Sequence, residues 1–418
     1  MRPSACRSCG GVELHDVLSL GEMALANALP AEDQLGSPEP VYPLATVVCA
    51  DCSLLQLTET VSPPELFSEY AYFSSRSAPM VAHAKELVDA LVSERDLGPT
   101  DLVVEVGSND GYLLQHYAAR GVPTLGIDPA ANVVEAALAR GIPTRCAFLS
   151  PSLADELRSE GHAARVLHAN NVLAHVPDVN RFVAAIARLL ADDGVAVIET
   201  PYARDLVEKV EYDTIYHEHV FYYSVSSLRP LFERHALEIV RVERVPIHGG
   251  SLRIYASPRA TVAHAPMLDI EREERALHIH EPRFYEDFGA RVERLIDQQR
   301  DFLLARRDGG SRLAGYGAAA KATVSLNALG MSRETIEFVV DSTPYKQGRY
   351  VPGVRIPIVE PARLLDEMPD DVVILAWNFA DAIVEQEREY RGRGGTFVLL
   401  FPEPGVIAGD PVARSGRS

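Results

Sequence analysis

The stretch YDTIYHEHVFYY, residues 212–223, holds two histidines, one glutamate and four tyrosines. A histidine beside a carboxylate and a phenol can serve as a tuned general base, because its pKa lies near neutral pH. Two histidines one residue apart could also bind a metal ion, although HEH is not the HExxH zinc helix and no obvious third ligand follows. A surface loop with solvated histidines is a third interpretation. We favour catalysis, because this dense group follows a predicted strand at the edge of a sheet.

The local conformation decides which of these side chains face one another. On a helix, Tyr216 and His219 would share a face, and so would Glu218 and Tyr222. On an extended segment, His217 and His219 would share a face instead. The sequence leaves both arrangements open, and each places one histidine beside a carboxylate and a phenol.

Four of the five cysteines form two CxxC pairs, Cys6 with Cys9 and Cys49 with Cys52, separated by 39 residues. Four thiolates at tetrahedral corners suit a closed structural zinc site, which has no open position for catalysis. A dithiol redox centre and paired disulfides are the alternatives. We favour zinc, because the start MRPSACRSCGG lacks the apolar segment of an export signal. The fifth cysteine, Cys146, is expected to be a buried small hydrophobe.

The stretch DLVVEVGSNDG predicts an apolar strand that ends at Glu105 and turns through Gly107 and Gly111 into a helix. Such a turn brings backbone N–H groups close to a ligand. A dinucleotide fingerprint would have a glycine where Asn109 stands, and Asp110 would face a pyrophosphate badly. Asp110 could instead accept hydrogen bonds from the ammonium group of an amino acid, which indicates S-adenosylmethionine.

Later segments offer further contacts for such a cofactor. Asp128 ends a predicted strand 21 residues after Gly107, where its carboxylate can hold both ribose hydroxyls. This spacing alone also fits a nicotinamide cofactor, and an ordinary strand, turn and helix without a ligand is the remaining alternative. The other residues expected at the same edge are Ala147 and Phe148, as an apolar slot for adenine, and Asn170, Asn171 and His175.

Two motifs in the second half of the chain could bind an anionic substrate. In IHGGSLRIY, Gly249 and Gly250 allow close approach of the backbone, and Ser251 and Arg253 could bind an anion. A plain hairpin turn is the alternative. In GYGAAAKATVSLN, a turn of small residues precedes a helix that carries Lys321. The turn could cradle a phosphate, or it could be a tight strand-to-helix crossing.

The elements that must position these residues alternate between strand and helix. From residue 101, short apolar runs alternate with helical stretches, which predicts a parallel, doubly wound sheet in an α/β fold. A second block of this kind begins near residue 311. Between the blocks, RVERVPIHGGSLRIYAS predicts a pair of strands, and residues 267–306 predict a charged, mostly helical connection.

Length and charge exclude several classes of function. A chain of 418 residues with 47% hydrophobic residues predicts two or three globular domains. A net charge of −19 disfavours nucleic acids and anionic membrane surfaces as partners. No apolar run approaches the roughly 20 residues that span a bilayer. We therefore expect a cytoplasmic protein, either a monomer or a small homo-oligomer.

Together these motifs resemble the nucleotide-sugar C-methyltransferases that make branched deoxysugars for antibiotics, including those acting at C3 of dTDP-3-amino-4-keto sugars. The resemblance spans nearly the whole chain, through the paired CxxC module, EVGSNDG, NNVLAHV, YHEHVFYYS, HGGSLR, GYGAAAK and DSTPYKQGRYVPG. It implies an N-terminal zinc-binding domain over residues 1–70 and a class I methyltransferase domain, which binds S-adenosylmethionine in a Rossmann-like sheet, over 71–240. A second Rossmann-like domain, over 241–418, would help to hold the nucleotide sugar.

The resemblance also implies roles for matched positions. His219, the last residue of YHEH, corresponds to the base that removes a proton next to the C4 ketone, and the resulting enolate carbon would attack the methyl group. Glu218 would tune His219, and tyrosine hydroxyls would stabilise the enolate oxygen. The other residues expected around the sugar are Tyr72, His175, Tyr216, His217 and Tyr222.

Two other functions remain open at this point. A nicotinamide-dependent sugar epimerase or reductase would also use a Rossmann sheet, although the fingerprint glycines are missing at Gly107 and no YxxxK pair is evident. A non-catalytic zinc-module adaptor would keep the fold without the chemistry. The identity of the sugar, methylation at C3 or C5, and a need for a 3-amino group are not determined by the motifs.

Overall fold

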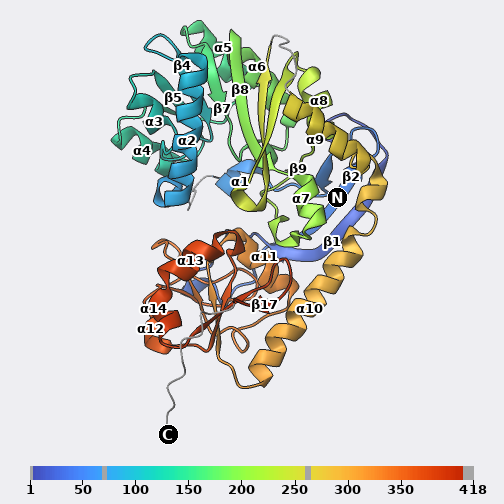
Figure 1. Cartoon of the computed structure of the whole chain (residues 1–418), viewed down its shortest axis with the longest axis vertical. Helices are drawn as coiled ribbons and strands as arrows, with labels where there is room; N and C mark the ends of the chain where they lie inside the picture. Colours follow the sequence, from blue (N-terminus) through green and yellow to red (C-terminus); the bar gives the residue numbers. More distant parts are fainter. Residues whose placement is uncertain (1–2, 68–72, 259–264, 408–418) are drawn as a thin grey trace. The chain divides into compact units, whose positions relative to one another are not determined.

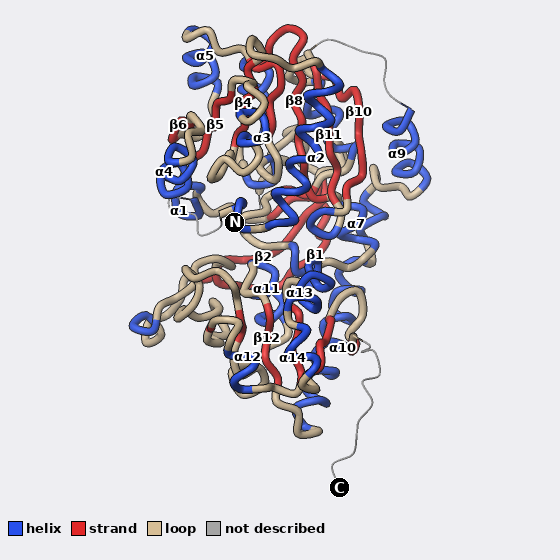
Figure 2. The backbone as a smooth tube through the Cα atoms, turned by 60° about the vertical axis from the view of Figure 1, so that its left-hand side comes forward, coloured by secondary structure: helices blue, strands red, loops and turns tan. Residues whose placement is uncertain are grey.

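The computed structural model describes residues 3–67, 73–258 and 265–407, so that the predicted sugar contact Tyr72 lies outside the described residues. The chain forms two compact units, in which strands lie inside and helices outside (Figure 2). Each unit combines segments from all three predicted sequence domains, whose boundaries stay a prediction. Unit 1 comprises Met1–Asp16, Val47–Arg204 and Glu218–Phe284, and unit 2 comprises Val17–Thr46, Asp205–His217 and Tyr285–Ser418.

Unit 1 is built on a seven-stranded sheet in the order β10-β11-β8-β7-β4-β5-β6. The strands from β4 to β8 are mutually parallel, as predicted. The predicted strand pair β10 and β11 forms an antiparallel hairpin that joins β8, so that the complete sheet is mixed. The strands are β4 (Leu102–Val106), β5 (Thr124–Asp128), β6 (Thr144–Cys146), β7 (Ala164–His168), β8 (Leu190–Pro201), β10 (Glu238–Val245) and β11 (Ser251–Ser257).

Helices cover both faces of this sheet (Figure 1). Because side chains alternate along a strand, Val103 and Val166 pack toward α2 and α3, whereas Val104 and Leu167 pack toward α5, α6 and α8 on the other side. Both faces are therefore dry, as expected for parallel strands. The helices are α2 (Ala78–Arg95), α3 (Leu114–Ala118), α4 (Ala131–Ala139), α5 (Pro151–Ser159), α6 (Val179–Leu189), α8 (Val225–Glu233) and α9 (Ala265–Ala276).

The cysteine segments pack against the same core. Strand β3 (Leu55–Leu57) pairs antiparallel with β9 (Phe221–Tyr222), the short strand that follows the YHEH motif. Cys6 and Cys52 belong to one buried apolar cluster with Phe221 and Tyr223. Other elements in the first 250 residues are β1 (Leu14–Ala24), η1 (Glu32–Gln34), β2 (Val41–Cys49), α1 (Pro63–Phe67), η2 (Ser74–Arg76), η3 (Leu173–His175), α7 (Ala203–Glu208) and η5 (Ile247–Gly249).

Unit 2 holds a six-stranded sheet in the order β14-β13-β12-β15-β16-β17, which is parallel except at β17. The predicted second α/β block is thus confirmed, as is the mostly helical connection that precedes it. Among the described residues, no helix has both the length and the apolar composition needed to cross a membrane. The elements are η4 (Tyr212–Thr214), η6 (Pro282–Tyr285), α10 (Phe288–Asp308), β12 (Leu313–Tyr316), α11 (Ala320–Ala328), β13 (Val339–Val340), β14 (Ile358–Val359), α12 (Arg363–Glu367), β15 (Asp371–Ile374), η7 (Trp377–Phe379), α13 (Ala380–Gln386), α14 (Arg388–Gly392), β16 (Thr396–Leu399) and β17 (Gly405–Val406).

A buried carboxylate ties α9 to the start of α8. Glu274 is fully buried, and its Oε1 accepts hydrogen bonds from the Tyr202 hydroxyl at 2.9 Å and the Val225 N–H at 2.8 Å. Its Oε2 accepts from the Ser226 N–H at 2.8 Å and the Ser226 hydroxyl at 2.6 Å. The carboxylate therefore satisfies N–H groups that a helix N-terminus leaves without partners.

We expect Glu274→Gln to lower the free energy of unfolding by about 2–3 kcal/mol. The amide nitrogen is a donor, and it would replace a carboxylate oxygen that accepts two hydrogen bonds. Urea unfolding measures this change. The neighbouring Glu273, which is exposed and pairs with Arg204, is the matched control. Glu273→Gln should cost less than about 0.5 kcal/mol. Equal effects of the two substitutions would contradict the role given to Glu274.

Candidate active site

The strand order of unit 1 reverses beside β4. The chain runs from β4 to β5 on one side and returns to β7 on the other, so that β4 and β7 flank a topological switch point. Ligands of open α/β sheets bind outside the carboxyl ends of the strands at such a point. Glu105 near the end of β4, Asp128 at the end of β5 and Asn170 just beyond β7 all lie at this edge.

The turn after β4 depends on glycine. Gly107 has a φ of +66°, and a Cβ at this position would lie 2.4 Å from Cγ2 of Val172. Gly111 closes the turn with a φ of +80°, and Asn109 also adopts a left-handed conformation with a φ of +49°. The N–H of Gly107 is bonded to the Ile127 carbonyl at 2.8 Å, which fixes the turn to β5. The backbone can therefore approach a ligand closely here.

Two buried acceptors at the switch point lack donors among the described residues. They are Oε2 of Glu105 and Oδ1 of Asn170, on the neighbouring strands β4 and β7. Burial, together with Asp128 and Asp110, raises the pKa of Glu105 well above its usual value. Unsatisfied buried acceptors suit a ligand that brings donors, such as an ammonium group. This edge therefore fits the amino-acid part of S-adenosylmethionine.

Asp128 is oriented by the backbone around it. Its Oδ2 accepts the N–H of Asn109 and its Oδ1 accepts the N–H of Ala130, each at 2.9 Å. A carboxylate has about four acceptor positions, so that two ribose hydroxyls can still be accommodated. Ala147 lies nearby, since its N–H donates to the Asp128 carbonyl at 3.0 Å. Phe148 is 49% exposed.

Asp110 already has partners within unit 1. Its Oδ2 lies 2.9 Å from Nη1 of Arg140 and accepts the Ser75 hydroxyl at 2.5 Å, and its Oδ1 accepts the Ser75 N–H at 3.2 Å. The adjacent Asn109 accepts the N–H of Ser74 through its side chain at 2.9 Å. In this structure Asp110 and Asn109 hold the segment before α2 against the turn, and their predicted contact with a cofactor stays a prediction.

One expectation about this edge was wrong. Cys146, predicted to be buried, is exposed, and its Sγ lies 3.7 Å from the carbonyl oxygen of Pro129. Cys146 ends β6, which is the edge strand of the sheet. A side chain on a short edge strand is not covered by a neighbouring strand, and this exposure cannot be inferred from the residue type alone.

The YHEH motif adopts a turn followed by β9, which is neither the helix nor the extended strand considered above. The ring of His219 packs edge-to-face against His175, with centroids 4.8 Å apart, and lies 6.2 Å from the ring of Tyr222. The N–H of Val220 donates to the Ala174 carbonyl at 2.8 Å. The structure thus brings His175, His219 and Tyr222 together.

The two histidines of the motif have different surroundings. His217 is buried, its ring centroid lies 5.8 Å from that of Tyr42, and its Nε2 lies 3.2 Å from the Tyr42 carbonyl oxygen. Glu218 is buried and Tyr216 is half-buried. The division between the two units falls between His217 and Glu218. His217 and His219 therefore belong to different units.

His175 is held neutral. Burial lowers the pKa of His175 to about 4, and a hydrogen bond to the backbone of Glu218 opposes this effect only in part. A neutral imidazole next to His219 adds no positive charge that would disfavour protonation of His219. This arrangement suits a base that must accept a proton.

A buried ion cluster on the α2 face was missed by sequence reasoning. Both carboxylate oxygens of Glu199 lie within 3.0 Å of Nε2 of His83, and Oε1 accepts a hydrogen bond from Nε of Arg253 at 2.7 Å. The hydrogen bonds from His83 and the charge of Arg253 hold the pKa of Glu199 below its usual value despite burial. Since 116 residues separate His83 from Glu199, no local spacing could have indicated the contact.

The remaining predicted contacts lie in ordinary local structure. Gly249 and Gly250 have φ values of +97° and +139° at the turn of the β10–β11 hairpin, and the Ser251 hydroxyl donates to the Ile247 carbonyl at 3.1 Å. Asn171 adopts a φ of +56° and donates its N–H to the Glu199 carbonyl at 2.8 Å. The Nζ of Lys321 in unit 2 is buried and lies 4.0 Å from the ring centroid of Trp377. Cofactor binding by Asn171 and anion binding by the other residues stay predictions.

The four paired cysteines meet in one cluster. Their sulfur atoms all lie within 4.8 Å of one another, with Cys6 and Cys52 at 3.6 Å and Cys9 and Cys49 at 3.5 Å. All four are free thiols, so the alternative of paired disulfides was wrong. A tetrahedral zinc ion with Zn–S bonds of about 2.3 Å would place its sulfurs about 3.8 Å apart. The distances of 3.6 and 3.5 Å lie close to this value, so the cluster fits zinc.

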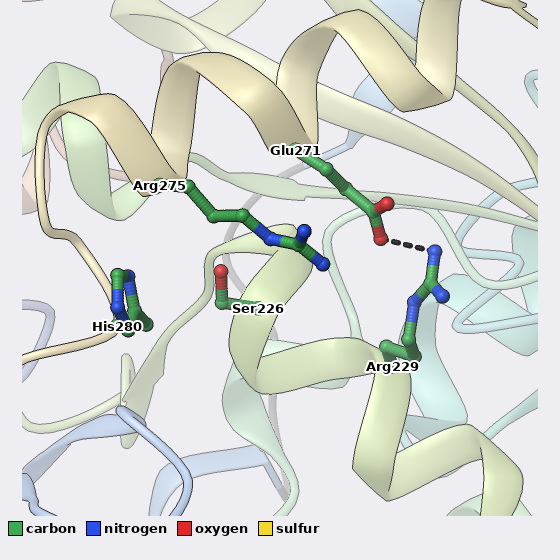
Figure 3. Close-up of a pocket in the computed structure, with 5 residues that line it drawn as sticks. All are labelled: Ser226, Arg229, Glu271, Arg275 and His280. Carbon is green, nitrogen blue, oxygen red and sulfur yellow. Dashed lines mark ion pairs between the residues drawn. The ribbon is translucent and has the colours of Figure 1, made fainter.

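A separate hollow lies between α8 and α9 (Figure 3). It encloses about 280 Å³, and an ion pair between Arg229 and Glu271 crosses it. The described residues that line it are Ser226, Arg229, Glu271, Arg275 and His280, none of which is a predicted site residue.

Family models match the chain in three consecutive parts. They are a zinc binding domain (residues 6–67), a methyltransferase domain (80–242) and a C-methyltransferase C-terminal domain (246–402). The chain is 37% identical to C-methyltransferase NovU of Streptomyces niveus over 408 residues, which cover 97% of each protein. It is 27% identical over 99 residues to a ubiquinone biosynthesis O-methyltransferase of Bartonella quintana, covering 23% of this chain and 40% of that protein.

Among solved structures, the Synechocystis magnesium protoporphyrin IX methyltransferase with bound S-adenosylmethionine matches 42% of this chain and 78% of its own. The identity is 17% and the TM-score is 0.33. This likeness is too weak to bear on the function.

The switch-point turn, the unsatisfied acceptors beside it and the methyltransferase domain model define a methyltransferase that depends on S-adenosylmethionine. The match to NovU covers 97% of both proteins, and the last third of the chain matches a C-methyltransferase C-terminal domain. These two matches narrow the class to enzymes that methylate carbon. The chain belongs to the C-methyltransferase family that includes NovU of Streptomyces niveus. The epimerase and adaptor alternatives do not fit this family.

We expect the purified protein to contain one zinc ion per chain. A mercurial thiol reagent should release this ion and lower the melting temperature by several degrees. The reason is that structural zinc contributes folding free energy. Cys49→Ser should lose the metal, whereas Cys146→Ser, a change at the exposed cysteine, should keep it. Absence of zinc, or melting that does not change on its release, would contradict the assignment.

His168 provides a test of pH dependence. It is fully buried, bonded to the Tyr117 hydroxyl at 2.9 Å, and burial lowers its pKa to about 3. The unfolded chain takes up this proton near pH 6.5 and the folded chain does not, so stability falls as the pH falls. As the pH is lowered from about 7.5 to 5.5, the free energy of unfolding should fall by about 1.4 kcal/mol more in wild type than in His168→Gln. Urea unfolding at each pH measures this difference. A stability difference independent of pH would contradict this.

Proposed function

We propose that this C-methyltransferase transfers a methyl group to a ring carbon of a dTDP-4-keto-deoxysugar, at C3, in the formation of a branched deoxysugar. The observation that carries the proposal is the grouping of His219 with His175 and Tyr222 beyond the carboxyl end of β8. Family membership supports carbon as the methylated atom. The resemblance of the motifs to nucleotide-sugar enzymes supports the substrate class.

The reaction begins with loss of a proton next to a ketone. His219 removes the proton from C3, and the electron pair of the broken C–H bond moves into an enolate whose oxygen is at C4. Tyr216 and Tyr222 donate hydrogen bonds to that oxygen as its charge develops. The enolate carbon then forms the new C–C bond with the methyl group while the electron pair of the broken S–C bond stays on sulfur, which leaves S-adenosylhomocysteine, and the proton remains on His219 until solvent removes it.

The residues around His219 prepare it for this step. Glu218 stabilises the protonated imidazole electrostatically, as a carboxylate near a general base does. His175 remains neutral and limits the rotation of the His219 ring through the edge-to-face contact. His217 and Tyr72 line the substrate in this proposal.

The bound cofactor supplies an electrophilic methyl group on a sulfonium ion. The residues proposed to hold it are Glu105, Gly107, Asn109, Asp110, Gly111, Asp128, Ala147, Phe148, Asn170 and Asn171. Among these, Glu105 and Asn170 offer acceptors for the ammonium group, and Asp128 accepts the ribose hydroxyls. Burial of the edge strengthens each of these contacts, because the local dielectric is low.

The test is mass spectrometry of dTDP-4-keto-deoxysugars, with and without a 3-amino group, after incubation with methyl-deuterated S-adenosylmethionine. A labelled methyl group on C3 is the expected result. Label on C5 would show that C5 is the methylated carbon. No transfer to any of these sugars, despite measured cofactor binding, would overturn the proposed substrate class.

We expect His219→Asn to lower the rate of transfer by about 10²- to 10⁴-fold, the range that a general base contributes. Binding of S-adenosylhomocysteine, measured by calorimetry, should not change. His162→Asn, at the half-exposed His162 next to Glu160, is the matched control and should keep full activity. Full activity of folded His219→Asn would show that another group removes the proton.

A further inference from the structure

Lys321 is half-buried at the start of α11 in unit 2, and its Nζ is buried. Its Nζ lies 4.0 Å from the ring centroid of Trp377 and has no hydrogen-bond partner among the described residues. An ammonium group removed from water is costly unless opposite charge or an aromatic face compensates it. Trp377 supplies part of that compensation, and the rest must come from nearby carboxylates.

Two buried carboxylates just before the YHEH motif supply the opposite charge. Oδ2 of Asp213 accepts the indole N–H of Trp377 at 2.8 Å. Oδ1 of Asp213 and Oε1 of Glu211 are buried and have no hydrogen-bond donors in the described part of the chain. Burial lowers the pKa of Lys321, and Asp213 and Glu211 act in the opposite direction. Lys321 and these carboxylates therefore stabilise one another's charged forms.

Lys321 also affects the pKa of each of the two carboxylates. Burial raises the pKa of Asp213 to about 6 and that of Glu211 to about 7, and Lys321 is the first of the charges that oppose these shifts. Without Lys321, both carboxylates would bind protons more readily at neutral pH. Lys209, near the surface, also faces Glu211 at 3.8 Å, and Asp205 lies beside it.

The helical turn η4, which carries Asp213, is fixed on both sides. The Tyr212 hydroxyl donates to Oε1 of Gln299 at 2.6 Å, and Nε2 of Gln299 donates to the Leu400 carbonyl at 2.8 Å. Ser325, one turn after Lys321 on α11, places its hydroxyl 3.5 Å from Oδ2 of Asp213. One face of α11 thus holds η4 through both charge and hydrogen bonding.

His219 follows Asp213 by only six positions in the sequence. The first part of this stretch is also restrained, because Ile215 is completely buried. A short stretch whose start is held in a packed position has few conformations available. The cluster around Lys321 therefore limits the conformations available to the start of the YHEH motif, Tyr216 and His217.

We propose that Lys321 is a positioning residue for the catalytic motif, and that its buried ammonium group is the counter-ion of Asp213 and Glu211 that holds η4 and the start of YHEH. The inference rests on the proposed role of His219. It replaces the expectation that Lys321 contacts an anionic group of the substrate.

The experiment compares Lys321→Met, Lys321→Met with Asp213→Asn, and the surface control Lys85→Met, at an exposed lysine of α2 that pairs with Asp89. We expect Lys321→Met to lower kcat by about 10- to 100-fold through misplacement of the base, with KM and S-adenosylhomocysteine binding unchanged. The double variant should recover part of the rate, because it removes the unpaired buried carboxylate while the oxygen of the introduced amide can still accept the indole N–H. Lys85→Met should keep the wild-type rate.

A second measurement does not depend on turnover. The imidazole resonance of His219, assigned by its loss in His219→Asn, should shift in Lys321→Met and return toward its position in the double variant. If wild type transfers no methyl group, the proposed function fails while this resonance still tests the positioning role.

Three outcomes would overturn the proposal. The first is a folded Lys321→Met with wild-type kcat and an unmoved resonance. The second is a higher KM that Asp213→Asn does not restore, since that indicates direct contact with the substrate. If Lys321→Met does not fold, the double variant decides, and a double variant that folds no better than Lys321→Met is the third.

Discussion

The backbone of Val220 holds three parts of unit 1 together. Its carbonyl accepts the N–H of Leu57 at 2.9 Å, and its N–H donates to the Ala174 carbonyl at 2.8 Å. The residue after His219 is therefore bonded both to the strand that follows the cysteine cluster and to the turn that carries His175. The contact between the two imidazole rings depends on this pair of backbone bonds. A metal site with no open coordination position would thus hold β3, and through it the residue after His219, in place.

Buried carboxylates at functional positions are a second constraint, and each is stabilised differently. Asp128 accepts two backbone N–H groups, Glu199 is paired with His83 and Arg253, and Asp213 accepts an indole N–H near an ammonium group. Such groups add little to stability compared with apolar residues of similar size. Their value is that the surrounding side chains have only one satisfactory arrangement. Glu105 differs, because one of its oxygens has no donor among the described residues, as expected where a ligand supplies it.

Much of the fold and part of the site could be predicted, because the relevant signals are local. A strand, a glycine turn and a helix within EVGSNDG form one continuous unit, and parallel strands bring their carboxyl ends to one edge. The CxxC pairs likewise indicate their own ligand geometry. The conformation of YHEH was not predictable, since it depends on hydrogen bonds from Val220 to residues far away in the sequence. The partners of Asp110 and the Glu199 cluster were missed for the same reason.

The sequence by itself determined the class of the sheets, the cysteine ligands and the candidate residues for the chemistry, because residue type and short-range spacing set hydrophobic periodicity and ligand chemistry. Only the tertiary structure decided that His219 faces His175 while His217 faces Tyr42, that Cys146 is exposed, and that the ammonium group of Lys321 lies against Trp377. These outcomes depend on which distant segments pack together. Packing between distant segments is set by the whole core, so a local pattern cannot contain it.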